Sequence, residues 1–204
     1  YDNLKLETLV FFGDVENDND NLGKSTAASV KLKYYMDNSE INFETGLLNE
    51  ESTLLGSKFE GAFALSDNNY TYFTGLSGKT KLTDKLGLFA NAYVGVTKAK
   101  SVSNSLISDI DNIVSHSASM GLEYNISKTR TAGFVLAQPL KVSNGGINYN
   151  LATSRSADGS YNVSSINQDL STEATEFNIQ GFYKHKLNSN ANLNFGAIHR
   201  INAN

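Results

Sequence analysis

The sequence contains no cysteine, no tryptophan and a single proline among its 204 residues. The absence of cysteine excludes disulfide bonds, thiolate catalysis and cysteine-ligated zinc. Scarce proline favours long, regularly hydrogen-bonded strands, because each proline removes a donor from a β-ladder. No apolar run approaches the roughly 18 residues that a membrane-spanning helix needs. A membrane β-barrel is compatible with these absences, because its strands alternate in polarity and can give a mean hydropathy as low as the −0.32 of this chain.

Charged residues are sparse and mixed in sign. They make up 19% of the chain, with 17 basic and 21 acidic residues and a formal net charge of −4. A nucleic-acid-binding domain would carry a basic stripe, so we expect no nucleic-acid partner. The length suits one domain or one large all-β unit, and residues 1–204 are treated as a single unit.

Apolar and polar residues alternate along most of the chain. The longest apolar face runs from Leu86 to Val96, and it is opposed by small or polar residues such as Gly87, Asn91 and Gly95. Successive side chains of a strand point to opposite faces, so each alternating segment has one apolar and one polar face. The pattern predicts an all-β, antiparallel fold.

The connections between these segments fall into two length classes. Short polar turns are expected at 37–40, 83–85, 127–130 and 188–191. Longer links are expected at 14–24, 49–69 and 99–115. Short turns that alternate with long loops are typical of up-and-down outer-membrane barrels, and residues 57–65 then belong to a long loop rather than to a spanning strand. This arrangement predicts about eleven strands of a twelve-stranded barrel, with the closing strand just beyond Asn204.

Two segments depart from strict alternation. Between Leu106 and Val114, apolar residues recur at helical spacing, which fits either a short amphipathic helix at a barrel mouth or a loop with a few buried anchors. Pro139 interrupts an otherwise regular strand, and a bulge or a strand end is expected there because proline cannot donate to the ladder.

Alternation alone does not say which face meets water. A soluble sandwich buries its apolar face, whereas a membrane barrel turns that face to lipid and lines its lumen with polar residues. The polar faces here are rich in Asn, Ser, Thr and Gly, and aromatic residues gather at segment ends, as interfacial girdles do. Missing tryptophan counts against a membrane barrel, and a soluble sandwich remains the alternative.

Under the membrane interpretation, the two faces are assigned residue by residue. The predicted lipid-facing residues are Leu86, Leu88, Ala90, Ala92, Val94, Val96, Met120, Leu122, Phe177, Ile179 and Phe195. The predicted lumen-facing residues are Lys31, Lys33, Glu44, Lys79, Asn91, Glu123, Asn178, Gln180 and Asn194.

Several stretches between Leu47 and Asn202 resemble the C-terminal translocator of autotransporters whose passenger is a subtilisin-like serine protease. The most specific is the run from Gln138 to Gly145, Q-P-L-K-V-S-N-G, followed by Asp158-Gly159. Other similar stretches are Leu54-Leu55-Gly56-Ser57, Gly61-Ala62-Phe63-Ala64-Leu65, Phe73-Thr74-Gly75-Leu76-Ser77-Gly78 and Leu82-Thr83-Asp84-Lys85-Leu86. The chain departs from the family at Ala174-Thr175, where a Gly-Arg pair is usual.

The resemblance implies an outer-membrane β-barrel of a Gram-negative bacterium, which anchors and displays an upstream passenger at the cell surface. Its implied partners are the lipid bilayer, its own passenger or linker helix and the outer-membrane assembly machinery. A protease triad would lie upstream of Tyr1, so this segment is expected to be no enzyme. The alternatives are a soluble β-sandwich adhesion module and a simple outer-membrane pore.

Motifs for catalysis, metals and cofactors are missing from the sequence. His116, His185 and His199 form no metal-binding spacing, and neither a nucleophile elbow nor a phosphate-binding loop occurs. The acidic run from Asp14 to Asp20 lacks the glycine and the terminal glutamate of a calcium loop, which favours a solvated loop. We therefore predict no cofactor, no metal and no catalytic residue. A barrel enzyme centred on His116 or His185 is the remaining enzymatic alternative.

Overall fold

A computed structural model describes residues 3–17, 20–66, 68–188 and 191–202 as an all-β protein with antiparallel pairing throughout. The described residues form no α-helix, and their one 3-10 turn is η1 (Gly61–Phe63). The fourteen strands are β1 (Leu4–Asn17), β2 (Asp20–Met36), β3 (Ser39–Glu50), β4 (Thr53–Leu54), β5 (Ser57–Lys58), β6 (Asn69–Lys81), β7 (Leu86–Lys98), β8 (Ile107–Ile110), β9 (Ile113–Ser127), β10 (Arg130–Asn144), β11 (Gly146–Arg155), β12 (Tyr161–Asp169), β13 (Phe177–Lys186) and β14 (Asn192–Ile201).

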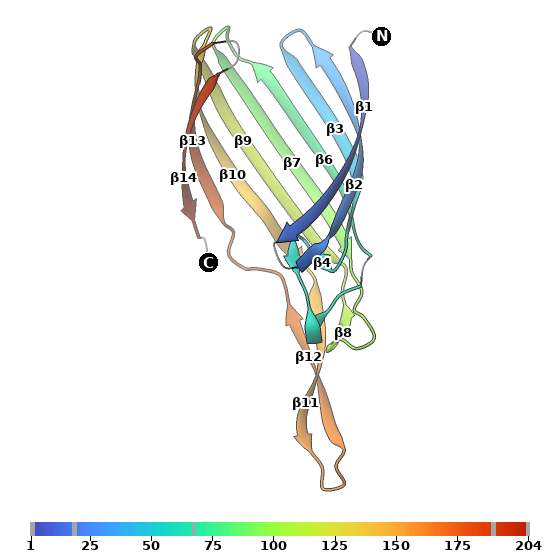
Figure 1. The fold of residues 1–204 in the computed structure, drawn as a ribbon. Helices are drawn as coiled ribbons and strands as arrows, with labels where there is room; N and C mark the ends of the chain where they lie inside the picture. Colours follow the sequence, from blue (N-terminus) through green and yellow to red (C-terminus); the bar gives the residue numbers. More distant parts are fainter. Residues whose placement is uncertain (1–2, 18–19, 67, 189–190, 203–204) are drawn as a thin grey trace.

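Nine of these strands form one strongly curved sheet in the order β1-β2-β3-β6-β7-β9-β10-β13-β14 (Figure 1). Each of the nine strands pairs with the next strand of the same sheet along the chain, so the sheet is an up-and-down meander. Short connections such as 37–38, 82–85 and 128–129 lie at one end, called here the turn end. The longer connections and the β11–β12 hairpin lie at the opposite loop end.

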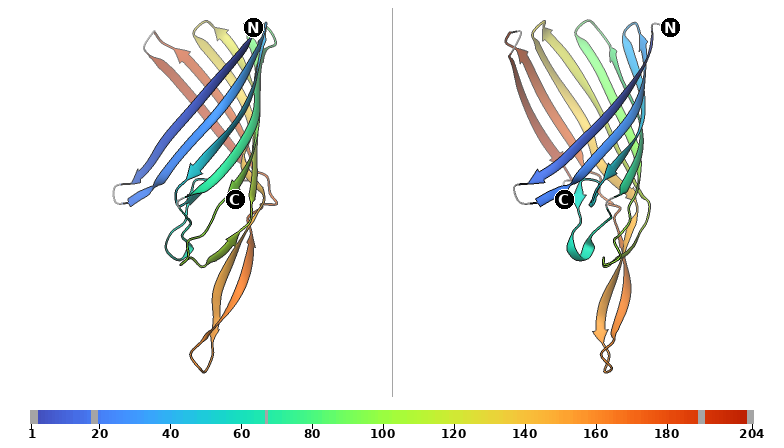
Figure 2. Two further views of the ribbon diagram at one scale, coloured as in Figure 1. Left: turned by 90° about the vertical axis from the view of Figure 1, so that its right-hand side faces the viewer. Right: turned by 45° about the vertical axis from the view of Figure 1, so that its right-hand side comes forward.

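The curved sheet is open along one side. Among the described residues, the outer edges of β1 and β14 have no strand partner, and the two edge strands stand apart in both further views (Figure 2). An antiparallel sheet of nine strands places its first and last strands in the same direction. The prediction of an up-and-down antiparallel meander is therefore confirmed, whereas the described residues form no closed barrel.

The strand count of about eleven is wrong, because the described residues form fourteen strands. The short β4, β5 and β8 lie in links that the sequence pattern treats as loops, since segments of two to four residues are too short to show alternation. The expected link at 14–24 is largely strand. There β1 continues to Asn17 and pairs with β2, and a register shift lies between Asp14 and Glu16.

The loop end holds the dry core of the described residues. The buried hydrophobic side chains are Leu54, Leu65, Ala99, Ile107, Ile113 and Ile147. The helix considered between Leu106 and Val114 is not formed. Ile107 begins β8 and Ile113 begins β9, and both side chains are buried, so the loop-anchor alternative was the better one. Residues 57–65 form no spanning strand, as predicted, and contribute β5 and η1 to the loop end.

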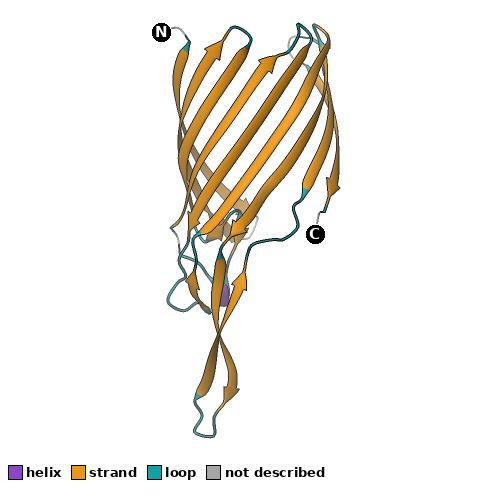
Figure 3. Ribbon diagram, turned by 180° about the vertical axis from the view of Figure 1, so that it is seen from behind, coloured by secondary structure: helices purple, strands orange, loops and turns teal. Residues whose placement is uncertain are grey.

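One further prediction concerns β10. The register between β9 and β10 shifts between Gln138 and Lys141, so the bulge expected at Pro139 is present. Beyond it, β11 and β12 pair into a hairpin that projects from the loop end (Figure 3). At its tip the Ser160 hydroxyl and backbone N–H both donate to Asp158, which lowers the pKa of that carboxyl below its ordinary value.

Candidate functional site

The two faces of the curved sheet differ sharply in chemistry. On β7, Val94 shares its face with the other even-numbered residues, whereas Asn91 lies on the opposite face. Cross-strand register extends this division to the neighbouring strands, because Leu88 pairs with Leu122 and Asn91 pairs with Ser119. We call the face that carries Val94 the outer face and the face that carries Asn91 the inner face.

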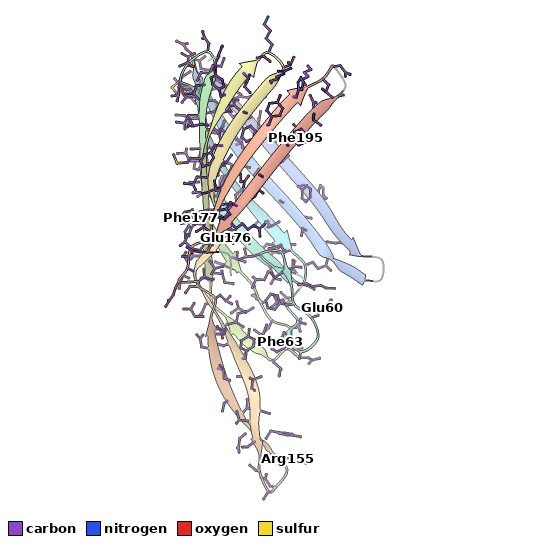
Figure 4. The ribbon with its side chains drawn as sticks, turned by 90° about the vertical axis from the view of Figure 1, so that its left-hand side faces the viewer. Glu60, Phe63, Arg155, Glu176, Phe177 and Phe195 are labelled. Carbon is purple, nitrogen blue, oxygen red and sulfur yellow. The ribbon has the colours of Figure 1, made fainter. Side chains whose placement is uncertain are left out.

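All the residues predicted to face lipid lie on the outer face. The register places Leu86, Leu88, Ala90, Ala92, Val94, Val96, Met120, Leu122, Phe177, Ile179 and Phe195 there. Many are open to their surroundings, with Met120 53% and Phe195 62% exposed. Figure 4 marks Phe177 and Phe195 on the last two strands. An apolar surface of this extent is unusual for a soluble monomer and marks a contact with lipid or protein.

The total exposed area of the chain is also larger than that of a soluble globular monomer of the same mass. The chain exposes 13604 Å², whereas a globular monomer of its 22.2 kDa mass would expose about 9,400 Å². A soluble sandwich would turn its alternating apolar residues into a shared interior. Here the dry core is confined to the loop end, and the apolar stripes of the large sheet are not covered by any described segment.

Most tyrosines and phenylalanines of the outer face lie toward the strand ends, whereas Phe43 lies at mid-strand beside Leu76. Tyr124 and Tyr183 both pair with Ala132 from opposite sides, and Phe195 continues this row near the turn end. Near the loop end, Phe12 and Tyr72 are also exposed on this face. The aliphatic residues lie between the two groups, as in the aromatic belts of membrane proteins.

All the residues predicted to line a lumen lie on the inner face. The register places Lys31, Lys33, Glu44, Lys79, Asn91, Glu123, Asn178, Gln180 and Asn194 there. Several of them pair with other inner-face side chains. Lys79 pairs with Glu40 at 2.9 Å, and the Asn91 amide donates to the Ser119 hydroxyl at 2.7 Å.

Glu44 is the centre of the inner-face network. Its carboxylate lies 3.0 Å from the Lys31 Nζ and accepts hydrogen bonds from the hydroxyls of Ser29 and Tyr93 at 2.8 and 3.1 Å. Tyr93 lies two strands away on β7, so its ring must cross β6 to reach Glu44. Side chains that converge in this way lie on the concave side of a curved sheet. A second network links Glu7 on β1 to Lys33 at 2.8 Å and to Lys5 at 2.8 Å.

The crossing of Tyr93 depends on a glycine. Gly75 lies directly opposite Tyr93 in the register, and a Cβ at that position would overlap the tyrosine ring. Three further inner-face rings cover directly opposed glycines in the same way: Phe73 over Gly46, Phe89 over Gly121 and Phe182 over Gly133. The sequence analysis missed these pairs. Aromatic residues inside otherwise polar faces are the signal that could have revealed them.

The inner face of the two edge strands carries exposed apolar side chains among polar ones such as Glu7 and Asn194. Leu9 and Phe11 of β1 lie on this face and are 64% and 55% exposed. Ile198 of β14 lies there as well and is 59% exposed. The inner face thus combines a polar middle with apolar side chains beside the open side of the sheet.

The buried polar groups at the loop end serve the structure of the loops. The Glu50 carboxylate is buried and accepts backbone hydrogen bonds from Leu55 at 3.1 Å and from Gly56 at 2.8 Å. The buried Asn69 amide donates to the carbonyls of Thr53 and Ser66, and its oxygen accepts from the Lys100 backbone N–H. The polar atoms of Glu50 and Asn69 therefore have their partners within the loops themselves.

The remaining candidates for chemistry do not come together. His116, His185 and His199 lie on three different strands of the outer face. Within the part of the chain that the structure describes, no three His, Cys, Asp or Glu side chains could share a metal ion. In the acidic run, Asp14 pairs with Lys24 in the β1–β2 ladder, and Asp18 lies outside the described residues.

No helix within the described ranges is long and apolar enough to cross a membrane. Comparison with protein-family models, with curated proteins and with solved structures finds no match for this chain. The function therefore has to be argued from the two faces of the sheet themselves.

Proposed function

We propose that the chain is an outer-membrane β-barrel segment that anchors and translocates a passenger of the autotransporter type. The observation that carries the proposal is the inverted facing of the sheet, with apolar side chains exposed on the convex side and polar side chains paired on the concave side. A membrane barrel has this arrangement, and a soluble sandwich has the opposite one.

Strand length supports a membrane-spanning role. The strand β7 has 13 residues, which extend about 43 Å at roughly 3.3 Å per residue. At a tilt of roughly 45° such a strand rises about 30 Å, close to the thickness of a bilayer hydrocarbon core. In hydrocarbon the open edges of β1 and β14 would leave backbone groups unpaired at a large cost. The proposal therefore requires one added strand, antiparallel to both edges, to close the sheet.

The choice of a translocator over an open pore rests on two supports. One is the sequence resemblance carried by the run from Gln138 to Gly145. The other is the exposure of the apolar side chains Leu9, Phe11 and Ile198 on the inner face of the two edge strands. A lumen filled only with water would leave these side chains wet, whereas a linker segment held inside would cover them.

Reconstitution tests the proposal directly. The chain is refolded with phospholipid vesicles, washed with urea and analysed for vesicle association and for a gel mobility that changes on heating. The expected result is retention in the vesicles, together with a gel mobility that differs between boiled and unboiled samples. A chain that folds in water without lipid and is washed from the vesicles would contradict the proposal. Steady conductance in planar bilayers would favour an open pore over a translocator.

A further inference from the structure

Positive charge is concentrated on one side of the sheet. No Asp or Glu occurs in 125–157 or in 178–204. The charged residues of β10, β13 and β14 are therefore all basic. On the other side of the sheet the inner-face charges are largely balanced by ion pairs, as in Lys31–Glu44 and Lys79–Glu40. The asymmetry leaves the inner face positively charged near β13 and β14.

Three lysines on this side of the sheet line one cleft at the turn end. It has a volume of about 480 Å³, and it is lined by Lys128, Thr129, Thr131, Lys184, His185, Lys186, Asn192 and Asn194. Register places Lys184 beside both Thr131 and Asn194, so three strands contribute to its wall. Every side chain of this lining that carries a formal charge is a cation.

The three lysines of the cleft lack carboxylate partners within the described ranges. The Lys184 Nζ lies 5.1 Å from the centre of the Phe182 ring, which holds the ammonium group over an aromatic face. The nearest acidic position by register is Glu123, which lies opposite Gly133, and it lines a different cleft beside Gly87. Three ammonium groups at one place repel one another unless an anion joins them.

We infer that this cleft binds a phosphate group. Lysine is a common phosphate ligand and acts as a point charge, and a phosphate with two negative charges balances several ammonium groups better than a single carboxylate does. The Thr129 hydroxyl and the Asn192 and Asn194 amides line the same cleft and supply further donors to phosphate oxygens, whereas the Thr131 hydroxyl donates to the Asn125 side chain at 2.9 Å. The phosphate can belong to a soluble molecule or to a lipid headgroup, and the site goes beyond the anchoring role proposed above.

Calorimetric titration of the refolded chain in maltoside micelles tests the inference. Inorganic pyrophosphate is one probe, and short-chain phosphatidic acid added to the micelles is the other. Replacement of Lys128, Lys184 and Lys186 together by Gln should raise the pyrophosphate dissociation constant about tenfold, and higher salt should reduce this difference. The matched control replaces Lys79 and Lys81 of β6 and Lys85 of the β6–β7 turn by Gln and should leave the constant unchanged.

A second variant keeps the test valid if the triple variant fails to fold. Asn194→Asp preserves size but adds a carboxylate among the lysines, so it should weaken pyrophosphate binding to a similar degree. A loss confined to pyrophosphate assigns a soluble phosphate, and a loss confined to phosphatidic acid assigns a headgroup. The inference is overturned if the unaltered chain binds neither probe, or if the control triple loses as much affinity as the cleft triple.

Discussion

At the scale of single residues, the central question is what surrounds the outer face of β7. Val94 is 43% exposed on that face, and Asn91 lies on the inner face with its amide bonded to Ser119. If the outer face contacts hydrocarbon, Val94→Arg should lower the free energy of unfolding in a bilayer by about 2–4 kcal/mol. Asn91→Arg should be tolerated, because a polar lumen solvates the guanidinium group. Guanidinium titration of both variants in vesicles measures the difference, and equal tolerance would reject the assigned facing.

The packing of Tyr93 across Gly75 gives a second residue-scale prediction. Gly75→Ala places a Cβ where the tyrosine ring lies, so it should cost about 1–3 kcal/mol of unfolding free energy. In a Tyr93→Ala background the ring is gone, and most of that cost should disappear. A double-mutant cycle by denaturant unfolding measures the coupling. Additive effects of the two substitutions would show that overlap with the Tyr93 ring does not cause the cost of Gly75→Ala.

At the scale of elements, the buried Glu50 carboxylate organises the β4–β5 turn. Glu50→Ala would leave the N–H groups of Leu55 and Gly56 without their acceptor, at a cost of about 1–3 kcal/mol. The turn should then exchange its amide hydrogens faster, while amides in β7 stay protected. Hydrogen exchange followed by mass spectrometry measures both regions, with Glu51→Ala as the control. Uniform loss of protection across the sheet would show that Glu50 stabilises the whole sheet and not only the β4–β5 turn.

The β11–β12 hairpin is the second element whose role can be separated from the sheet. Its strands pair with β8 and with each other but not with the nine-stranded sheet. Replacement of Leu151–Ser164 by Asn-Gly keeps the Asn150–Ser165 pair and the buried Ile147, and Asn-Gly suits a two-residue hairpin turn. The unfolding midpoint of the sheet should stay within the error of the measurement. A large decrease would show that the tip of the hairpin stabilises the sheet.

The elements also show how far sequence reasoning extends. Alternation predicted most of the long strands and the division of their residues between an apolar and a polar face, because a period of two is dictated by the strand itself and persists over ten or more residues. It failed at β8, where Ile107 and Ile110 at helical spacing lie in a short strand whose burial is set by tertiary contacts. The glycine–aromatic pairs and the phosphate cleft were also missed, since both depend on which strands become neighbours rather than on local pattern.

At the scale of the whole molecule, the proposed function depends on what surrounds the apolar outer face of the sheet. The described residues bury few hydrophobic side chains outside the loop end, so the large sheet lacks a core of its own. Burial of apolar surface is the dominant favourable term in folding. The stability of the sheet should therefore come from what covers its outer face, and the isolated chain should need lipid or detergent to refold.

The absence of cysteine allows the most direct measurement, because a single introduced thiol can be labelled without background. Leu122→Cys and Glu123→Cys place adjacent labels on the outer and inner faces of β9. In vesicles, a fluorophore at 122 should be quenched strongly by brominated lipid tails, and one at 123 should be quenched mainly by aqueous iodide. Equal quenching of both labels by iodide, with no effect of the brominated lipids, would contradict the claim that the outer face lies in hydrocarbon.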